Sequence, residues 1–142
     1  MPDESLPLEL RLALRPGSVY YFQSRELTSG QPHFFVVVNR DPISTKRVLL
    51  TIVTSKVEAV RRRNRDRAET FIEISPTDYK ELKVDSAIDC NVVIEKPLLE
   101  LVGMVQRNEV RYHRDLPVQI FAKLKAAVLA SSVVAPEIKE LL

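Results

Sequence analysis

The sequence predicts a mainly β fold of the α+β class: a small barrel of about five strands with a C-terminal helix and short accessory helices. Two apolar runs, at 33–39 and 48–54, have the length and the β-branched composition of buried strands. Turn residues separate successive runs of this kind. In the last third of the chain the apolar residues change to helical spacing, which indicates helices packed at one end of the strands.

The composition of the 142-residue chain is that of an ordinary globular protein, with 45% hydrophobic and 28% charged residues. We expect one domain over 1–142, with the barrel at 15–115 and a helical segment at 116–142. The net charge of +2 does not by itself demand a nucleic-acid partner. Because we find no signal-peptide pattern and no apolar run of membrane-spanning length, we expect a cytoplasmic protein with no membrane partner.

The first elements follow from turn signals and from strand composition. Leucines at every second position before residue 15 fit either a short helix over 3–14 or a strand. Pro16 and Gly17 mark a turn, and 19–23 has the aromatic and β-branched composition of the first strand. The next expected elements are a loop at 24–32, a strand at 33–39, a turn at 40–47 and a strand at 48–54.

The second half of the chain returns to strand character and then becomes helical. Ser75 is a suitable N-cap and Pro76 suits the first helical position, so we expect a short helix over 75–82. Apolar residues at helical spacing predict a longer helix over 116–130. The other expected elements are a charged excursion at 58–67, strands at 70–74 and 84–95, a turn or short helix at 98–102, a small strand at 107–112 and a helix at 136–142.

His33 is the first candidate for a catalytic group, because it stands where a loop becomes a buried strand. An imidazole can act as a general acid or base near neutral pH and can donate to phosphate. The alternative is a partly exposed histidine that closes the mouth of the barrel. His113, between Tyr112 and Arg114, is interpreted as a solvated surface residue. With two histidines and no carboxylates clustered at ligand spacing, we expect no metal site and no cofactor.

Thr54, Ser55 and Lys56 end the third expected strand with two hydroxyls and an ammonium group. Such groups can hydrogen-bond a phosphate and offset its charge. The alternative is purely structural, since threonine and serine are common at strand ends and in turns.

Five arginines fall within seven residues directly after this region. They are Arg61, Arg62, Arg63, Arg65 and Arg67. Guanidinium groups bind phosphates and stack on bases, and flexible arginine-rich loops bind RNA. A solvated face and an acidic protein partner are the alternatives, because Glu58, Asp66 and Glu69 offset part of the charge.

Asp89 and Asn91 flank Cys90 inside an apolar stretch. Strand alternation places both polar side chains on one side, where Asp89 either orients a histidine or arginine or simply faces solvent. The single cysteine excludes an internal disulfide, and we expect it to be a small buried hydrophobe.

Four short motifs follow one another along the chain. They are Gly17–Tyr20 (Gly-Ser-Val-Tyr), Pro32–Asn39 (Pro-His-Phe-Phe-Val-Val-Val-Asn), Ile52–Ser55 (Ile-Val-Thr-Ser) and Asp85–Ile88 (Asp-Ser-Ala-Ile). Their type and order resemble the MazF/PemK family of toxin–antitoxin ribonucleases. That family's strands carry Gly-(Asp/Ser)-Val-Tyr, Arg-Pro-x-Val-Val-Val-x-Asn, Ile-Thr-Ser and Asp-Ser-x-Ile, and a helix closes the chain. The similarity covers residues 15–130.

The resemblance implies an SH3-like barrel that forms a homodimer, cleaves single-stranded RNA without metal and is neutralised by an antitoxin. In such chemistry the ribose 2′-hydroxyl attacks the adjacent phosphate, which requires a proton acceptor, a proton donor and a group that stabilises the phosphorane charge. Thr54 matches the family's hydroxyl position. The family's arginine position falls on Pro32 or His33, so the resemblance leaves His33 as the proton shuttle and Arg25 as a source of charge.

Two functions therefore follow from the sequence, and whether the protein is an enzyme stays open between them. The first is an endoribonuclease with His33, Thr54, Ser55 and Arg25 as catalytic residues, and with RNA bound by Lys56 and the five arginines. The second is a non-catalytic module that binds nucleic acid or protein on the same barrel, its site inactive because the family's arginine is absent.

Overall fold

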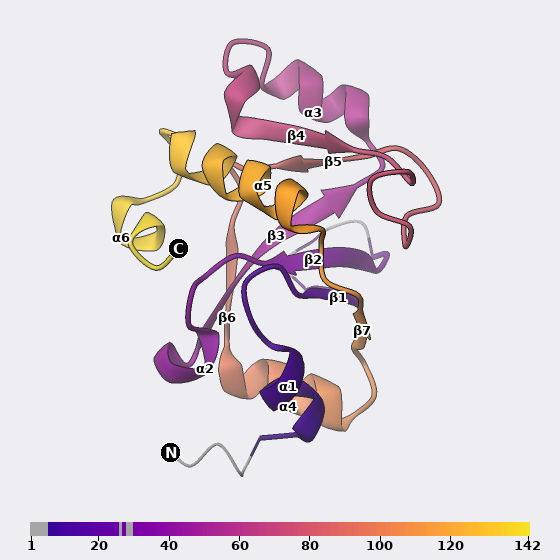
Figure 1. Ribbon diagram of the computed structural model, residues 1–142, viewed down its shortest axis with the longest axis vertical. Helices are drawn as coiled ribbons and strands as arrows, with labels where there is room; N and C mark the ends of the chain where they lie inside the picture. Colours follow the sequence, from indigo (N-terminus) through magenta and orange to yellow (C-terminus); the bar gives the residue numbers. More distant parts are fainter. Residues whose placement is uncertain (1–5, 26, 28–29) are drawn as a thin grey trace.

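The computed structural model describes residues 6–25, 27 and 30–142 (Figure 1). The strands are β1 (Val19–Phe22), β2 (His33–Val37), β3 (Arg47–Thr54), β4 (Phe71–Ile74), β5 (Ser86–Asp89), β6 (Ile94–Pro97) and β7 (Arg111–His113). The helices are α1 (Leu8–Ala13), α2 (Pro42–Thr45), α3 (Val57–Arg63), α4 (Leu98–Gln106), α5 (Val118–Ala130) and α6 (Pro136–Lys139), with a 3-10 turn, η2, at Ala68–Thr70. No described helix is long and apolar enough to cross a membrane.

All strand pairs are antiparallel, and the strands follow the order β4-β5-β3-β2-β1-β7. β3 is the central strand, because its first half also pairs with β6 while its last residues pair with β5. The sheet is not closed, since β4 and β7 stand at opposite ends of the order and do not pair with each other in the described part of the chain. The expected mainly β, α+β class is confirmed, with an open and bent sheet.

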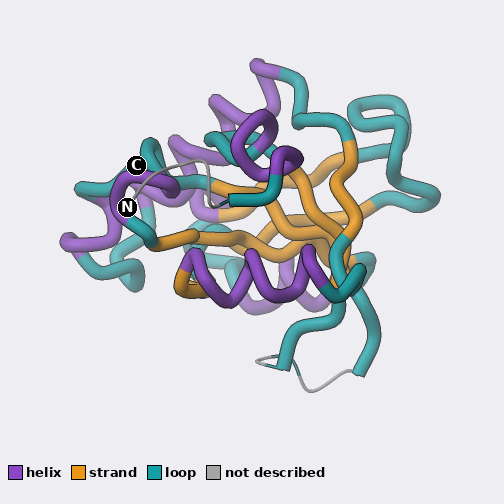
Figure 2. The backbone as a smooth tube through the Cα atoms, turned by 90° about the horizontal axis from the view of Figure 1, so that it is seen from below, coloured by secondary structure: helices purple, strands orange, loops and turns teal. Residues whose placement is uncertain are grey.

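Strands β1, β2 and β3 turn alternate side chains to two separate apolar clusters. Val19 and Val36 pack in the cluster that contains α5, whereas Tyr20 and Phe35 pack in the cluster that contains α1 and α4. Figure 2 shows helices on both sides of the strands. Because both faces of the sheet are covered, the strands read in the sequence as nearly continuous apolar runs.

The segments that begin and end the chain fold largely as expected. Of the two alternatives for 3–14, the helix is correct over Leu8–Ala13, while residues 3–5 lie outside the described part. The turn at Gly17 is confirmed by its φ of 89°, a left-handed conformation that glycine adopts without strain. Helix α5 covers most of 116–130 and begins directly after Pro117, which suits a helix start because proline has no N–H to satisfy there.

Two segments in the middle differ from expectation. The strand expected over 84–95 is divided into β5 and β6 by a turn. The helix expected over 75–82 is instead a turn, in which the Ser75 amide donates to Asp78 Oδ2 at 2.9 Å and the Asp78 amide donates to Ser75 Oγ at 3.2 Å. Tyr79, which follows this turn, is buried, and its hydroxyl donates to the carbonyl of Arg114 at 2.5 Å.

Three helices are more extensive than the sequence indicated. The charged excursion 58–67 begins as helix α3, the turn at 40–47 contains the short helix α2, and the short helix at 98–102 extends as α4 to Gln106. In α2, Asp41 caps the first turn by accepting from the Ser44 amide at 3.3 Å.

Candidate functional site

The pairing of β2 with β3 brings His33 and Thr54 together. Phe34 pairs with Val53, and continuing this antiparallel register by one residue sets His33 opposite Thr54. Residues directly opposite on neighbouring strands have their Cβ atoms about 4.5–5.5 Å apart. The two side chains therefore share one site although twenty residues of chain separate them.

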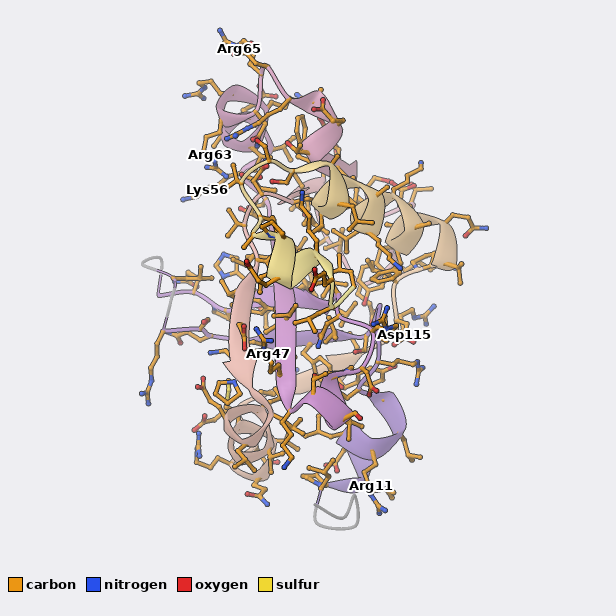
Figure 3. The ribbon with its side chains drawn as sticks, turned by 90° about the vertical axis from the view of Figure 1, so that its left-hand side faces the viewer. Arg11, Arg47, Lys56, Arg63, Arg65 and Asp115 are labelled. Atoms are coloured by element: carbon orange, nitrogen blue, oxygen red, sulfur yellow. The ribbon has the colours of Figure 1, made fainter. Side chains whose placement is uncertain are left out.

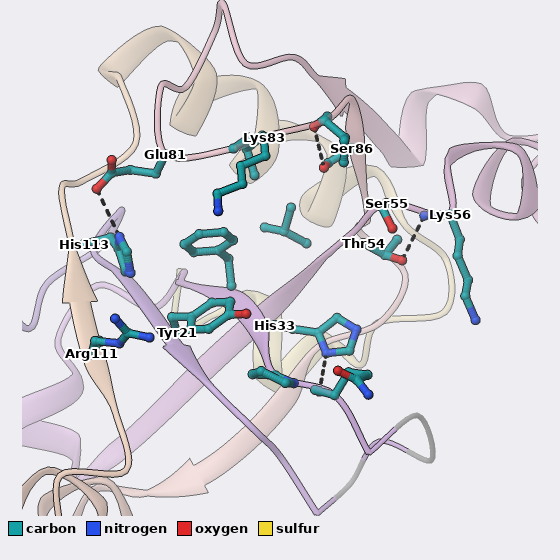
Figure 4. A pocket seen from close by; sticks show the side chains of 16 residues that line it. Tyr21, His33, Thr54, Ser55, Lys56, Glu81, Lys83, Ser86, Arg111 and His113 are labelled. Atoms are coloured by element: carbon teal, nitrogen blue, oxygen red, sulfur yellow. Dashed lines mark hydrogen bonds and ion pairs between the residues drawn. The ribbon is translucent and has the colours of Figure 1, made fainter.

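A cavity of about 800 Å³ lies at this end of the sheet (Figure 4). His33 and Thr54 line it from the ends of β2 and β3, and Lys56 follows from the start of α3. Lys83, in the connection between β4 and β5, lines another wall, and His113 on β7 lines a third. With Tyr21 of β1, the cavity collects side chains from five separate parts of the chain.

A second, smaller cavity of about 310 Å³ shares His33, Thr54 and Lys56 with the first. It extends toward Arg63 at the end of α3 and Asp89 at the end of β5. The three shared residues therefore stand where the two cavities meet, and we call this place the junction.

The hydrogen bond of His33 indicates which of its two ring nitrogens carries the hydrogen. Its Nδ1 atom lies 2.9 Å from the carbonyl oxygen of Gln31. A carbonyl oxygen only accepts, so Nδ1 carries the hydrogen in this contact, and Nε2 carries the lone pair in the neutral ring. Nε2 is therefore the atom that can take up a proton.

The junction also holds hydrogen-bond donors on the Thr54 side. Thr54 Oγ1 accepts from the backbone amide of Lys56 at 3.1 Å, which leaves the hydroxyl hydrogen able to donate. Ser55 and Lys56 are exposed, and Ser55 lines the larger cavity. Figure 4 shows the Thr54 hydroxyl on the same wall as Ser55 and Lys56.

His113 is a residue of the cavity wall, and its interpretation as a solvated surface residue is wrong. Its Nδ1 atom lies 3.0 Å from Glu81 Oε1, and its side chain is 25% exposed. The hydrogen bond from His113 holds the pKa of Glu81 below its usual value. The sequence offered little indication that His113 lines a cavity. The strand that holds it is only three residues long, and it pairs with β1, which is distant in the chain.

The arginine run begins in the last turn of helix α3 and continues into the turn that follows it. Arg61 donates two hydrogen bonds of 2.6 Å to Glu73 and another to Glu58. Arg63 pairs with Asp89 at 3.2 Å, and Arg67 donates to Asn64 at 2.9 Å. Figure 3 shows Lys56 and Arg63 projecting on the same side of the molecule, with Arg65 at its tip.

The run thus divides into arginines that are engaged and arginines that face solvent. Arg62 and Arg65 are exposed, and within the described ranges they have no hydrogen bond or ion pair. Among the five arginines of the run, all of them in the described part of the chain, Arg62 and Arg65 can therefore meet a polyanion without first giving up a carboxylate or amide partner.

Arg25 lies in the connection after β1 and does not line either cavity. Its positive charge acts on Glu109, whose pKa is lowered mainly by the hydrogen bond from Arg107 and to a smaller extent by Arg25. Arg111 and Lys83, which the sequence did not single out, bring cationic groups to the larger cavity. Arg111 stands two positions before His113 in β7, and this strand-like spacing places both on one face.

Beneath the smaller cavity lies a buried polar network centred on Asn91. Asn91 Nδ2 donates to Asn64, Thr70 and Asp89 at 2.8–3.0 Å. Ser131, directly after α5, donates to Asn91 Oδ1 at 2.5 Å. The network joins the ends of α3, β5 and α5 at the turn that divides the expected strand, and it gives the buried polar groups there their hydrogen-bond partners.

Cys90 next to it is fully buried, and burial raises the pKa of its thiol to about 12, so the group is an unreactive thiol at neutral pH. In the described ranges, 6–25, 27 and 30–142, no three histidine, cysteine, aspartate or glutamate side chains lie together as metal ligands would.

The open antiparallel sheet, with helices on both faces and the site where β2 begins and β3 ends, has a MazF-like fold. The chain is similar to one in an endoribonuclease–cognate antitoxin complex from a mycobacterial species, with a TM-score of 0.51 and 13% identity over 86% of this chain and 96% of that one. It is also similar to a chain of the MazE–MazF complex from Deinococcus radiodurans, with a TM-score of 0.53 and 9% identity over 80% and 91% of the two chains.

No protein-family model matches the sequence, and a comparison with curated proteins found no match. At such low identity the structural similarity establishes the fold alone, so the resemblance in motif order is confirmed at the level of fold.

Proposed function

We propose that this chain is a MazF/PemK-like toxin, an endoribonuclease that cleaves single-stranded RNA by 2′-hydroxyl attack without metal. The observation that supports it is the junction, where residues with an imidazole, a hydroxyl and an ammonium group line both cavities at the start of β2 and the end of β3 in a MazF-like fold. These are the group types that the reaction needs: a proton acceptor, a hydrogen-bond donor and a cation.

In the proposed reaction His33 Nε2 takes the proton from the ribose 2′-hydroxyl as the 2′-oxygen forms a bond to phosphorus. The bond between phosphorus and the 5′-oxygen breaks, and this oxygen takes up a proton from solvent in the open cavity. The Thr54 hydroxyl and the Lys56 ammonium group stabilise the charge of the phosphorane, with Ser55 beside them. Arg111 and Lys83, which line the same cavity, supply the positive charge for which the sequence suggested Arg25.

Two partners belong to the same proposal. An antitoxin protein would neutralise the chain, and the support for it is that one similar structure is an endoribonuclease in complex with its cognate antitoxin. A homodimer is proposed from the sequence resemblance.

The decisive test is incubation of the purified chain with a long single-stranded RNA in EDTA, followed by mapping of the cut ends. His33→Ala and Thr54→Ala should each lower the cleavage rate by about a hundredfold or more, the lower end of typical acid–base contributions. Thr77→Ala is the matched control for Thr54, because Thr77 is an exposed threonine outside both cavities, and it should cleave like wild type. Unchanged cleavage in both junction variants would remove these residues from the mechanism.

A non-catalytic binding module is the second candidate. It is favoured by one observation: the family's arginine position holds Pro32 or His33, and Arg25 lies away from both cavities. This candidate predicts salt-sensitive binding of RNA without cleavage, weakened when Arg61, Arg62 and Arg63 are changed together to alanine. Cleavage by the wild-type chain in EDTA would reject it.

A further inference from the structure

Three aromatic rings gather on one wall of the larger cavity. The ring centroids of Tyr21 and Phe34 are 4.8 Å apart, and those of Phe34 and His113 are 5.0 Å apart. Tyr21 meets His113 nearly edge-on at 6.0 Å. All three residues are only partly buried, and their ring planes are inclined at 54–80° to one another, so a base can stack on one ring while the other two border it; we call the three the aromatic platform.

The sheet fixes the platform in place. Tyr21 pairs with Phe34 on β2 and with Arg111 on β7, so side chains from three neighbouring strands stand side by side. Phe34 is supported from behind by the edge-on ring of Tyr79, and the His113 ring is held by its hydrogen bond to Glu81. A platform that needs no reordering loses little conformational entropy when it receives a ligand.

Positive charge surrounds these rings. The guanidinium carbon of Arg111 lies 5.9 Å from the centroid of the Tyr21 ring, and Figure 4 shows the Lys83 ammonium group pointing into the cavity. The negative group on this wall, Glu81, is already engaged by His113. Aromatic faces beside cations are what proteins use to hold single-stranded nucleic acid, because bases stack on the rings while the cations attract the phosphates.

The platform also lies next to the junction. Consecutive residues of a strand point to opposite faces, but at this end of the sheet His33 and Phe34 of β2 and Val53 and Thr54 of β3 all line the same cavity. A nucleotide whose base rests on the platform therefore has its phosphates within reach of the side chains at the junction.

We propose that the aromatic platform of Tyr21, Phe34 and His113 is a stacking subsite for one unstacked nucleobase of single-stranded RNA, adjacent to the phosphodiester at the junction. The choice of RNA as ligand rests on the proposed function. The subsite takes any base, because stacking uses the π-face that all bases share.

Binding of an uncleavable ligand tests the subsite separately from catalysis. The probe is a 2′-O-methyl oligoribonucleotide, compared with an abasic oligonucleotide of the same length and the same number of phosphates. Tyr21→Leu should weaken binding of the base-containing probe by about tenfold, whereas Tyr21→Phe should stay within about twofold of wild type. Binding of the abasic probe should be the same for all three proteins.

Tyr112→Leu is the matched control, because Tyr112 is an exposed tyrosine of β7 outside both cavities, and it should bind both probes like wild type. His113→Gln removes a different ring of the platform and should also weaken binding of the base-containing probe. This variant replaces Tyr21→Leu if circular dichroism shows that Tyr21→Leu does not fold. Wild-type affinity for the base-containing probe in a folded Tyr21→Leu or His113→Gln variant would overturn the subsite.

The two proposals fail in different ways. If the wild-type chain prefers the base-containing probe through Tyr21 but does not cut RNA, the stacking subsite is supported and the proposed ribonuclease activity is rejected. If the wild-type chain cuts RNA but Tyr21→Leu binds the base-containing probe with full affinity, the ribonuclease activity is supported and the stacking subsite is rejected.

Discussion

At the scale of single residues, Asp89 shows how a buried charge is held in this protein. Its side chain is 10% exposed, and it accepts hydrogen bonds from Asn91 and Arg63. Burial raises the pKa of the carboxyl, but the hydrogen bonds outweigh burial and leave the pKa below its ordinary value. Of the two alternatives that the sequence left for Asp89, orientation of an arginine is therefore the correct one.

A lowered pKa in the folded state makes stability depend on pH. The contribution of Asp89 is complete above the ordinary aspartate pKa of about 4 and is lost as the pH falls through the lower folded-state value. Asp89→Asn should therefore lower the free energy of unfolding at pH 7 by about 1–3 kcal/mol, and by less at pH 3. Urea unfolding of both proteins at the two pH values measures this; an equal difference at both would contradict it. Asp66→Asn, at an exposed aspartate, should change little.

The candidate residues differ in how far the sequence revealed them. His33 and Thr54 were visible because His33 begins one apolar run and Thr54 ends the next, and antiparallel pairing brings the start of one strand beside the end of the other. Lys83 and Arg111 were not visible, because their approach depends on a connection without regular structure and on the pairing of β7 with β1. Arg25 is the opposite case. It lies near the candidate residues in the sequence, but its side chain lines neither cavity and its charge contributes to the lowered pKa of Glu109.

At the scale of elements, helix α3 decides what the arginine run can do. Arg61 is tied to Glu58 and Glu73, whereas Arg62 next to it faces solvent. If the helix binds RNA, Arg62→Ala should reduce the slope of log Kd against log salt by about 0.7, the value for one phosphate contact on a single strand. Arg61→Ala should reduce it by less, because that guanidinium is already engaged. Titration of the 2′-O-methyl probe at several salt concentrations measures both; equal slopes in the two variants would contradict the division of the run.

The strands show that the apolar pattern of the sequence predicts where a strand lies better than whether it runs without a break. The runs at 19–23, 33–39 and 48–54 were found within two residues of β1, β2 and β3, because burial on both faces leaves an unmistakable apolar signal. The segment 84–95 holds more polar residues, and at the turn that divides it Asn91 hydrogen-bonds Asn64 and Ser131 in a buried network. Local sequence carries no sign of partners that far away in the chain.

At the scale of the whole molecule, two apolar clusters share one sheet. Leu124 of α5 and Leu101 of α4 lie in different clusters, at 0% and 1% exposure. Because β1, β2 and β3 contribute to both clusters, we propose that residues 1–142 unfold as one domain.

Leu124→Ala and Leu101→Ala should each lower the free energy of unfolding by about 2–5 kcal/mol, the usual cost of a cavity left by a buried leucine. In each variant, unfolding followed by tyrosine fluorescence and by circular dichroism should give one coincident transition, with the exposed Leu129→Ala as the control that changes little. Separate transitions in either variant would contradict the single domain.

Two different kinds of contact hold the two sides of the larger cavity in place. Thr54 ends β3, the strand with partners on both edges, so moving it means breaking the ladder to β2 and β5. The facing connection that carries Lys83 has no strand partner, and two side-chain hydrogen bonds, from Tyr79 to Arg114 and from His113 to Glu81, tether it to the chain around β7. Tyr79 and Leu82 also anchor this connection in the apolar core, so we expect an entering molecule to displace the exposed Lys83 side chain before it changes the spacing between His33 and Thr54.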